Sequence, residues 1–260
     1  MLTITDAQIN ALVGAFVWPF ARIVGLILAD PLLATRGVPR RFKAGFALFL
    51  TVLVVPVLPP LPAVPLVSAE GVAILVQQVL IGVGIGFAMR LVMAAVELAG
   101  FVIGTQMGLG FALFFDPMSS AQVPGVARLL SIFVFLLFLV MGGMQVLIGT
   151  LVDSFTVLPI GRSLPVEGWR TLAEWGGHLF AWGVWLSLPV VAALLVTNLA
   201  IGVMTRASPQ FNVFSFGFPL TLMVGFVALY FSLPLLLPAV ETMYRAAFEF
   251  ALAWLRTPAS

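Results

Sequence analysis

The sequence predicts an all-α integral membrane protein with about six long apolar helices arranged as hairpins. Apolar residues make up 62% of the 260 residues and charged residues only 8%, whereas about 25% of the residues in a soluble domain are charged. The mean hydropathy is +1.19. The apolar residues also gather in runs of roughly 20, the length that a helix needs to cross a bilayer.

Six apolar runs are the expected membrane helices. They cover residues 11–33, 42–58, 71–103, 129–151, 177–204 and 211–240. Pro19 lies inside the first run and predicts a kink there, because proline removes a helical hydrogen bond. The proline-rich residues 55–65 should end the second helix and form a stiff, extended connection. Residues 158–174 form the most polar connection, which separates four runs from a final pair.

The basic residues of the connections predict an orientation in the membrane. The first, third and fifth connections carry six Lys and Arg residues, while the fourth connection and the C-terminal tail carry four. An excess of Lys and Arg in short loops favours the cytoplasmic side. We therefore expect the odd-numbered connections in the cytoplasm and both termini on the opposite side.

Composition argues against an enzyme and against a nucleic-acid-binding protein. The chain has no cysteine and a single histidine, His178, so thiolate chemistry is excluded and a typical metal site cannot be built. Neither a GxSxG nor an HExxH motif nor a phosphate-cradling glycine loop occurs in the sequence. The net charge is only +2, and no basic face carries the interleaved aromatics that a nucleic acid would meet. We expect no catalytic residue, no metal and no cofactor.

Residues 104–128, GTQMGLGFALFFDPMSSAQVPGVAR, form the most unusual connection. A simple loop would be polar, but this one combines glycines with Phe and Met side chains around an Asp-Pro turn signal. Irregular backbone at membrane depth survives only where protein buries it or water lines it. The segment is therefore either a closure element inside a conduit or a re-entrant loop that packs between helices. As a closure element, its plug residues are Met107, Gly108, Gly110, Phe111, Phe114, Phe115, Asp116, Pro117 and Met118.

Glycines recur along the third apolar run. Small residues let helix backbones approach each other closely in lipid. The glycines therefore predict dense packing, either within the chain or against partner subunits. The candidate positions for subunit packing are Gly82, Gly84, Gly86, Gly100 and Gly104.

Several charged residues lie within the apolar runs or at their ends. A charge at the bilayer centre costs about 2.5–3.5 kcal/mol on insertion scales, so such residues usually face a partner, a cavity or an interface. Arg90 and Glu97 are seven residues apart and share one helix face. A proton relay through Arg90, Glu97 and Asp116 is the functional alternative to a structural role. The intramembrane charges are Arg22, Arg90, Glu97 and Asp153.

The connection between the last two runs predicts a tight turn. Pro209 breaks the helix, Ser208 offers local hydrogen bonds, and Arg206 favours the cytoplasmic side. We expect a cytoplasmic turn formed by Arg206, Ser208, Pro209 and Gln210.

Four stretches are distinctive enough to compare with known families. They are GVPRRFKAGFALFLT at 37–51, QQVLIGVGIGF at 77–87, GTQMGLGFALFFDPMSSAQVP at 104–124 and LVTNLAIGVMTRASPQFNVFSFGFP at 195–219. They resemble the FliR family of flagellar biosynthetic membrane proteins, over nearly the whole chain, and the last two are highly specific. The resemblance implies a FliP-like helical part over residues 1–174, with a plug loop near 104–123. A FliQ-like hairpin and C-terminal tail would follow over residues 175–260.

The resemblance also implies a function. Family members are subunits of the flagellar type III secretion export gate, in the basal body of the flagellum at the bacterial inner membrane. Such a subunit would form and seal the channel for unfolded flagellar proteins. The implied partners are FliP-like and FliQ-like membrane subunits, a FlhB-like protein, the exported chains and membrane lipid. The turn at residues 206–210 would then lie at the channel entrance, near the FlhB-like partner.

Two alternatives to this function stay open. The first is an export-gate subunit of a virulence type III secretion system, or injectisome. The second is a secondary transporter for a small solute, because a broken, glycine-rich middle is typical of such sites. Against the transporter, the two halves of the chain have no matching inverted pattern, and no polar cluster would bind a substrate.

Overall fold

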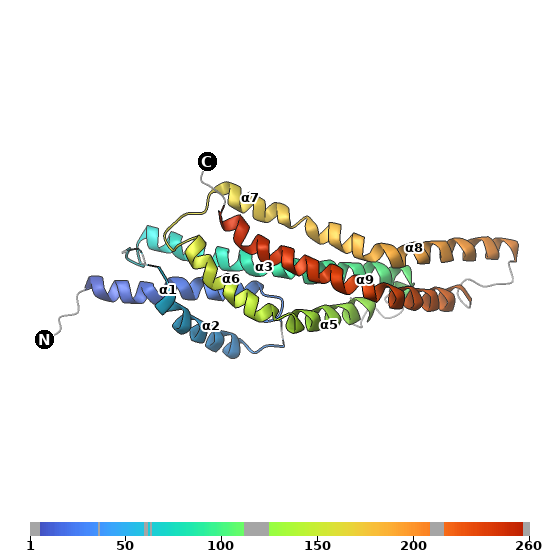
Figure 1. The fold of residues 1–260 in the computed structure, drawn as a ribbon, viewed down its shortest axis with the longest axis horizontal. Helices are drawn as coiled ribbons and strands as arrows, with labels where there is room; N and C mark the ends of the chain where they lie inside the picture. Colours follow the sequence, from blue (N-terminus) through green and yellow to red (C-terminus); the bar gives the residue numbers. More distant parts are fainter. Residues whose placement is uncertain are drawn as a thin grey trace. The chain divides into compact units, whose positions relative to one another are not determined.

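The computed structural model describes residues 6–35, 37–59, 62, 64–111, 125–208 and 216–256, with side chains from residue 13 onward and without that of residue 111. This part of the chain is helical and contains no strand. Its main helices are α1 (Asp6–Ala29), α2 (Arg40–Val54), α3 (Ala69–Gln106), α5 (Gly125–Val140), α6 (Gly143–Val157), α7 (Val166–Trp175), α8 (His178–Ala207) and α9 (Phe218–Ala253) (Figure 1). Short 3-10 turns lie at η1 (Val55–Val57), η2 (Leu109–Phe111) and η4 (Trp254–Arg256).

Among the residues whose side chains are described, fewer helices than the six expected are both long and apolar enough to cross a membrane. Within the described ranges, Ala69–Gln106, Val166–Ala207 and Phe218–Arg256 are long and apolar enough, and α5 with α6 makes a fourth if that broken pair is one span. Helix α2 has 15 residues, or about 22 Å at 1.5 Å per residue. The hydrocarbon core is about 30 Å thick. The all-α class is confirmed, and the expectation of six spans is not.

The fourth expected span, residues 129–151, is interrupted. Helix α5 ends at Val140 and α6 begins at Gly143. Gly142 lies between them with a φ of 70°, a left-handed conformation that only glycine adopts at no steric cost. The sequence stays apolar across this break. Hydropathy alone could not predict it, because a change of backbone conformation leaves hydropathy unchanged.

Helix α7 lies within a segment that the sequence predicts to be a polar connection. Glu167 lies in its first turn, where a carboxylate interacts favourably with the helix dipole. Arg170 donates to Glu174 at 2.9 Å in an exposed i,i+4 pair. The ring of Trp169 packs on that of Trp254, with 5.5 Å between the ring centroids. A short helix with charged residues on its exposed side resembles a loop in composition, which is why it was missed.

The described helices form two compact units. The first unit comprises residues 1–91, 142–176 and 245–260, and the second comprises residues 92–141 and 177–244. Helices α3 and α9 contribute to both units. The predicted division at residues 174/175 follows chain order, whereas these units bring together parts from both ends of the chain. The assignment of FliP-like and FliQ-like parts stays a prediction.

The first unit is held together by close contact between helices. Helix α2 lies against α1 (Figure 1) and buries a stripe with helical spacing, namely Ala47, Leu50, Thr51 and Val54. Helix α3 approaches α1 through Gly82, where an added Cβ would collide with the carbonyl oxygen of Arg22. A second glycine, Gly25 on α1, faces the carbonyl oxygen of Val79 in the same way.

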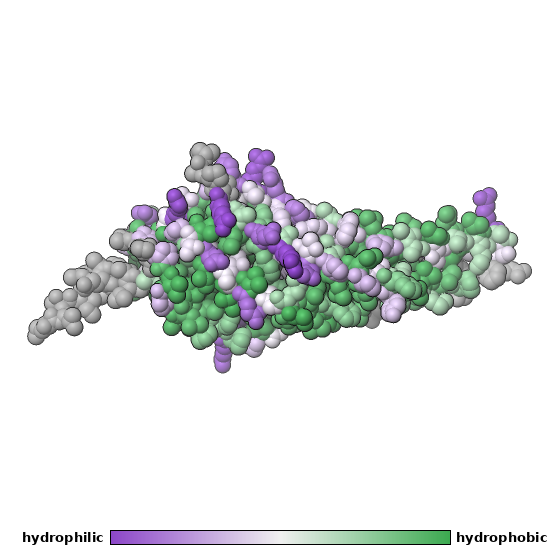
Figure 2. Space-filling view, in the orientation of Figure 1, coloured by the Kyte–Doolittle hydropathy of each residue, from purple (hydrophilic) through white to green (hydrophobic). Residues whose placement is uncertain are grey.

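The second unit has a large apolar surface. Only 28% of the most apolar part of Val166–Ala207 and 22% of that of Phe218–Arg256 is buried within the chain. Large exposed side chains on α8 and α9 include Trp185, Leu199, Met223, Phe226, Tyr230 and Phe231. The visible surface along α8 and α9 is largely apolar (Figure 2). In a membrane protein, such a surface faces lipid or partner helices.

Candidate functional site

The predicted plug loop, near residues 104–123, begins within the last turn of α3, and the first of its named plug residues, Met107, directly follows that helix. The helix ends at Gln106, and the N–H of Met107 still donates to the carbonyl oxygen of Ile103 at 2.9 Å. Gly108 then takes a φ of 84°, and the turn η2 carries Gly110 and the backbone of Phe111. The remaining plug residues lie outside the described residues, namely Phe114, Phe115, Asp116, Pro117 and Met118.

Met107 is completely buried, with 0% of its surface exposed. Its side chain lies over Gly225 of α9, where an added Cβ would be 2.6 Å from Met107 Cγ and 2.9 Å from both Sδ and Cε. The hydroxyl of Thr221, one turn earlier on α9, lies 3.4 Å from the carbonyl oxygen of Met107. The same hydroxyl donates to the carbonyl oxygen of Phe218 within α9 at 2.9 Å, so the end of α3 is held against α9 mainly by the packing of the Met107 side chain.

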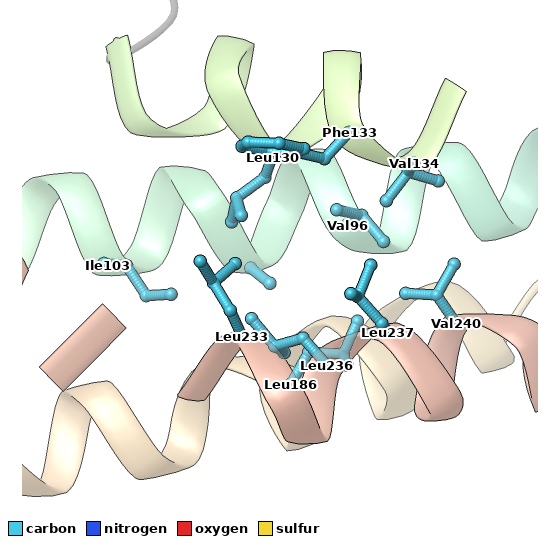
Figure 3. A pocket seen from close by; sticks show the side chains of 11 residues that line it. Val96, Ile103, Leu130, Phe133, Val134, Leu186, Leu233, Leu236, Leu237 and Val240 are labelled. Atoms are coloured by element: carbon cyan, nitrogen blue, oxygen red, sulfur yellow. The ribbon is translucent and has the colours of Figure 1, made fainter. Parts of the chain in front are cut away.

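A small apolar pocket lies in the same unit, one helical turn before Met107. It has a volume of about 20 Å³, and residues from α3, α5, α8 and α9 line it (Figure 3). Ile103 of α3, Leu130 of α5 and Leu186 of α8 point into it together with Leu233 and Leu237 of α9. All the lining side chains are aliphatic or aromatic, so the pocket offers no group for acid, base or metal chemistry.

The glycines predicted to pack between subunits contact the chain's own helices. A Cβ on Gly86 would lie 2.9 Å from Ala29 Cβ, and one on Gly84 would lie 2.7 Å from Trp254 Cζ2. Gly100 meets the backbone of Ala127 on α5 in the same way. Packing within the chain therefore accounts for Gly82, Gly84, Gly86 and Gly100. Gly104 is also buried, and a role of the five glycines between subunits stays a prediction.

Arg22 is the one predicted intramembrane charge that is fully buried, with 0% of its surface exposed. Its Nε donates to Gln78 Oε1 at 2.7 Å. Nη1 donates to the carbonyl oxygen of Ser154 at 2.8 Å and to its Oγ at 3.1 Å, and Nη2 donates to the carbonyl oxygen of Leu158 at 2.9 Å. The guanidinium lies 4.2 Å from the centre of the Phe155 ring. A cation thus binds the C-terminal end of α6, where the helix dipole favours positive charge.

The other intramembrane charges lie on the surface of the chain. Arg90, Glu97 and Asp153 are exposed. Ser131 Oγ lies 3.5 Å from Glu97 Oε1, and the two charges seven residues apart on α3 form no ion pair with each other in the described structure. A relay that also uses Asp116 involves a residue outside the described ranges and stays a prediction.

Comparison with known proteins decides the family. The family model described as bacterial export proteins, family 1, matches residues 13–247. The flagellar biosynthetic protein FliR of Pectobacterium carotovorum subsp. carotovorum is 42% identical over 250 residues, which cover 96% of this chain and 95% of the relative. FliR of Escherichia coli K12 is 40% identical over the same shares of both chains. FliR of Bacillus subtilis is 28% identical over 90% of this chain and 92% of the relative.

This chain belongs to the FliR family. The resemblance seen in its motifs is confirmed, and with it the assignment to a membrane protein of flagellar biosynthesis and protein export. The family description and the names of these relatives refer to export and to building the flagellum. The transporter alternative finds no support in the FliR relatives.

In this FliR family member, the structure describes two of the four residues of the predicted cytoplasmic turn, Arg206 and Ser208. Helix α8 ends at Ala207, with Arg206 exposed in its last turn, where a cation complements the helix dipole. The N–H of Ser208 donates to the carbonyl oxygen of Met204 at 2.8 Å, which closes the last turn. Pro209 and Gln210 lie outside the described residues.

Sequence reasoning missed several polar residues of the first unit. Gln78 and Ser154 bind Arg22, but the sequence offers no pattern that links them to it. Asp30 directly follows α1 and is fully buried. Its Oδ1 accepts hydrogen bonds from the N–H groups of Leu32 at 2.8 Å and Leu33 at 2.7 Å. Burial raises the pKa of the Asp30 carboxyl, and the two backbone donors act in the opposite direction.

Proposed function

We propose that this chain is a subunit of the flagellar type III export gate, and that it helps to form and seal the channel through which unfolded flagellar proteins cross the bacterial inner membrane. The observation that carries the proposal is the match to FliR proteins over almost the full length of both chains. The basal body of the flagellum is the proposed location.

The chemistry of the plug segment supports the sealing role. A hydrophobic constriction can close a pore by excluding water. Methionine is flexible and polarizable, so Met118 can re-form a seal around varied side chains. The two adjacent Phe residues fill volume, and the glycines before them allow the backbone to move. The segment also starts from a firmly held point, because Met107 is buried against α9.

The exposed apolar surface supports the proposed partners. Most of α8 and α9 is not covered by the chain itself, so other helices or lipid must cover it. The proposed neighbours are FliP-like and FliQ-like membrane subunits, with a FlhB-like protein near the turn at residues 206–210. Residues 1–174 would act as the FliP-like part and residues 175–260 as the FliQ-like hairpin.

Deletion of residues 110–120 tests the sealing role. We expect the gate to assemble and its resting conductance for ions to rise, because the apolar side chains that exclude water are gone. The measurement is ion flux across vesicles that carry the full complex, with co-purification of the subunits as the control for assembly. An assembled complex that stays tight to ions would contradict the plug assignment.

A further inference from the structure

We propose that Met107 and Gly225 form an anchor that fixes the start of the plug segment to α9, so that Met107 positions the segment instead of sealing the channel. The inference rests on the proposed function for the meaning of the segment. It assigns to Met107 a role different from that of the other plug residues.

The first argument is the position of Met107 at the last helical turn of α3. Its N–H continues the helical hydrogen-bond pattern to Ile103, so the helix fixes the direction of its side chain. The backbone turns at the next residue, Gly108, whose φ is 84°. Met107 is therefore the last residue that α3 holds before the chain changes direction.

The second argument is the absence of space at Gly225. An added Cβ there would lie 2.6 Å from Met107 Cγ and 2.9 Å from Sδ and Cε, closer than side-chain atoms approach each other. The absence of a side chain at Gly225 thus leaves the space in which the Met107 thioether packs. Thr221, Gly225 and Leu229 are buried along one stripe of α9 at a spacing of four residues, and Thr221 adds the contact to the Met107 carbonyl oxygen.

The third argument is accessibility. A side chain that seals a passage must reach the passage, and Met107 has no exposed surface. Gly110, three residues later, is only partly buried, and among the described residues an added Cβ would meet the Thr105 methyl group alone, at 3.9 Å. Within the described residues, Met107 is therefore packed against α9 and Gly110 is not fully buried, with the turn formed by Gly108 between them.

Cysteine labelling tests the anchor directly, because the chain contains no cysteine. The reporter is Gly110→Cys in the assembled complex, treated with a soluble maleimide. We expect Gly225→Ala to raise the labelling rate several-fold, because the new methyl group displaces Met107. The matched control is Gly202→Ala on α8, where an added Cβ meets no atom of the described residues within 4 Å and the labelling rate should stay unchanged.

Pairs of substitutions separate the anchor from general destabilisation. Met107→Ala should also raise the labelling rate. The double variant Met107→Ala/Gly225→Ala should label no faster than the faster of the two single variants, because both changes remove the same contact. Met107→Leu keeps the volume and should leave the rate near that of the parent. This comparison of Leu with Ala at position 107 tests the anchor even if Gly225→Ala does not assemble. Unchanged labelling in Met107→Ala, or additive effects in the double variant, would overturn the inference.

The resting conductance for ions, measured on the same variants, separates the anchor from the plug. Faster labelling together with a higher resting conductance supports both the anchor and the sealing role of the segment. Faster labelling without a leak supports the anchor and contradicts the sealing role of the segment. A leak with unchanged labelling contradicts the anchor and leaves the sealing role supported by the other plug residues.

Discussion

At the scale of single residues, Arg22 joins three segments of the first unit. Its guanidinium reaches Gln78 on α3 and two carbonyl oxygens at the end of α6. A buried cation is costly unless its donors are satisfied, and here four hydrogen bonds and the Phe155 ring surround it. All four hydrogen-bond acceptors are neutral groups, and none is a carboxylate that could exchange a proton with the guanidinium. Arg22 therefore connects the three segments and has no partner for a proton relay.

Arg22→Ala should destabilise the protein by about 3–5 kcal/mol, because several buried acceptors each lose a donor worth about 1–3 kcal/mol. Thermal unfolding of the purified complex in detergent measures the loss. Arg90→Ala is the matched control, since Arg90 is exposed and its removal should change stability little. Equal melting temperatures for the two variants would contradict the structural role of Arg22.

Asp30 should make the first unit more stable at acidic pH. Its native-state pKa is raised by burial, so the folded chain binds its proton more tightly than the unfolded chain does. The stabilisation is present below the unfolded-state pKa and is lost as the pH rises through the native-state pKa. Asp30→Asn removes the titration and keeps an oxygen acceptor for Leu32 and Leu33. Melting temperatures across a pH series should vary less for this variant than for the parent, and an identical pH dependence would contradict the prediction.

At the scale of the helices, contact between backbones decides which surfaces meet. Helices α1 and α3 touch through Gly25, Gly82 and Gly86, where no side chain fits. Close contact of this kind is the main source of helix affinity in lipid, because the hydrophobic effect does not act between helices there. The spacing of these glycines was visible in the sequence, but the partner helix was not.

Gly82→Ala should push α1 away from α3 and cost about 1–3 kcal/mol, the usual effect of overpacking. The melting temperature of the purified complex is the measurement. Gly149→Ala on α6 is the control, because no atom in the described part of the chain lies within 4 Å of an added Cβ there. Alanine in a helix is favoured over glycine by up to about 1 kcal/mol, so this variant should be as stable as the parent or more stable. A stabilising Gly82→Ala would show that the two helices are not in contact.

At the scale of the whole molecule, apolar surface exceeds what the chain can bury. Within the chain, only 28% of the most apolar stretch of Val166–Ala207 and 22% of that of Phe218–Arg256 is buried. Such a surface is stable only against lipid or other helices. This agrees with a chain that works within a larger membrane assembly.

The tagged chain should therefore co-purify from membranes with FliP-like and FliQ-like subunits, and should aggregate or be degraded when it is produced without them. Native mass measurement of the purified material tests this. A stable, active monomer would contradict the subunit assignment.

The orientation of the chain can be tested at the end of α8. Ser208→Cys introduces a unique thiol beside the exposed Arg206. A membrane-impermeant reagent should label it from the cytoplasmic side, because basic residues in short loops stay in the cytoplasm. Labelling from the periplasmic side alone would contradict the predicted orientation.

The sequence by itself determined the class of this protein. Hydropathy over 20 residues and helical hydrogen bonding are local properties, so the apolar runs predicted α3 and α8 within a few residues. Helix α9 was predicted as well, but it extends to Ala253, well beyond the predicted end at residue 240. The proline-rich stretch after Val54 likewise predicted the end of α2. The glycine- and phenylalanine-rich stretch after α3 was recognisable because its composition differs from that of both a loop and a helix.

Only the tertiary structure decided how distant residues meet. Arg22 binds residues 56, 132 and 136 positions away, and Met107 packs against Gly225 on α9, with four described helices between them in the chain. The left-handed backbone at Gly142 and the short helix α7 could not be predicted from the sequence either, because neither is marked by a distinctive change in hydropathy. The composition of a segment predicts whether it is more stable in contact with lipid or with water. The identity of the neighbour depends on shape and hydrogen bonding between segments, which exist only in the folded chain.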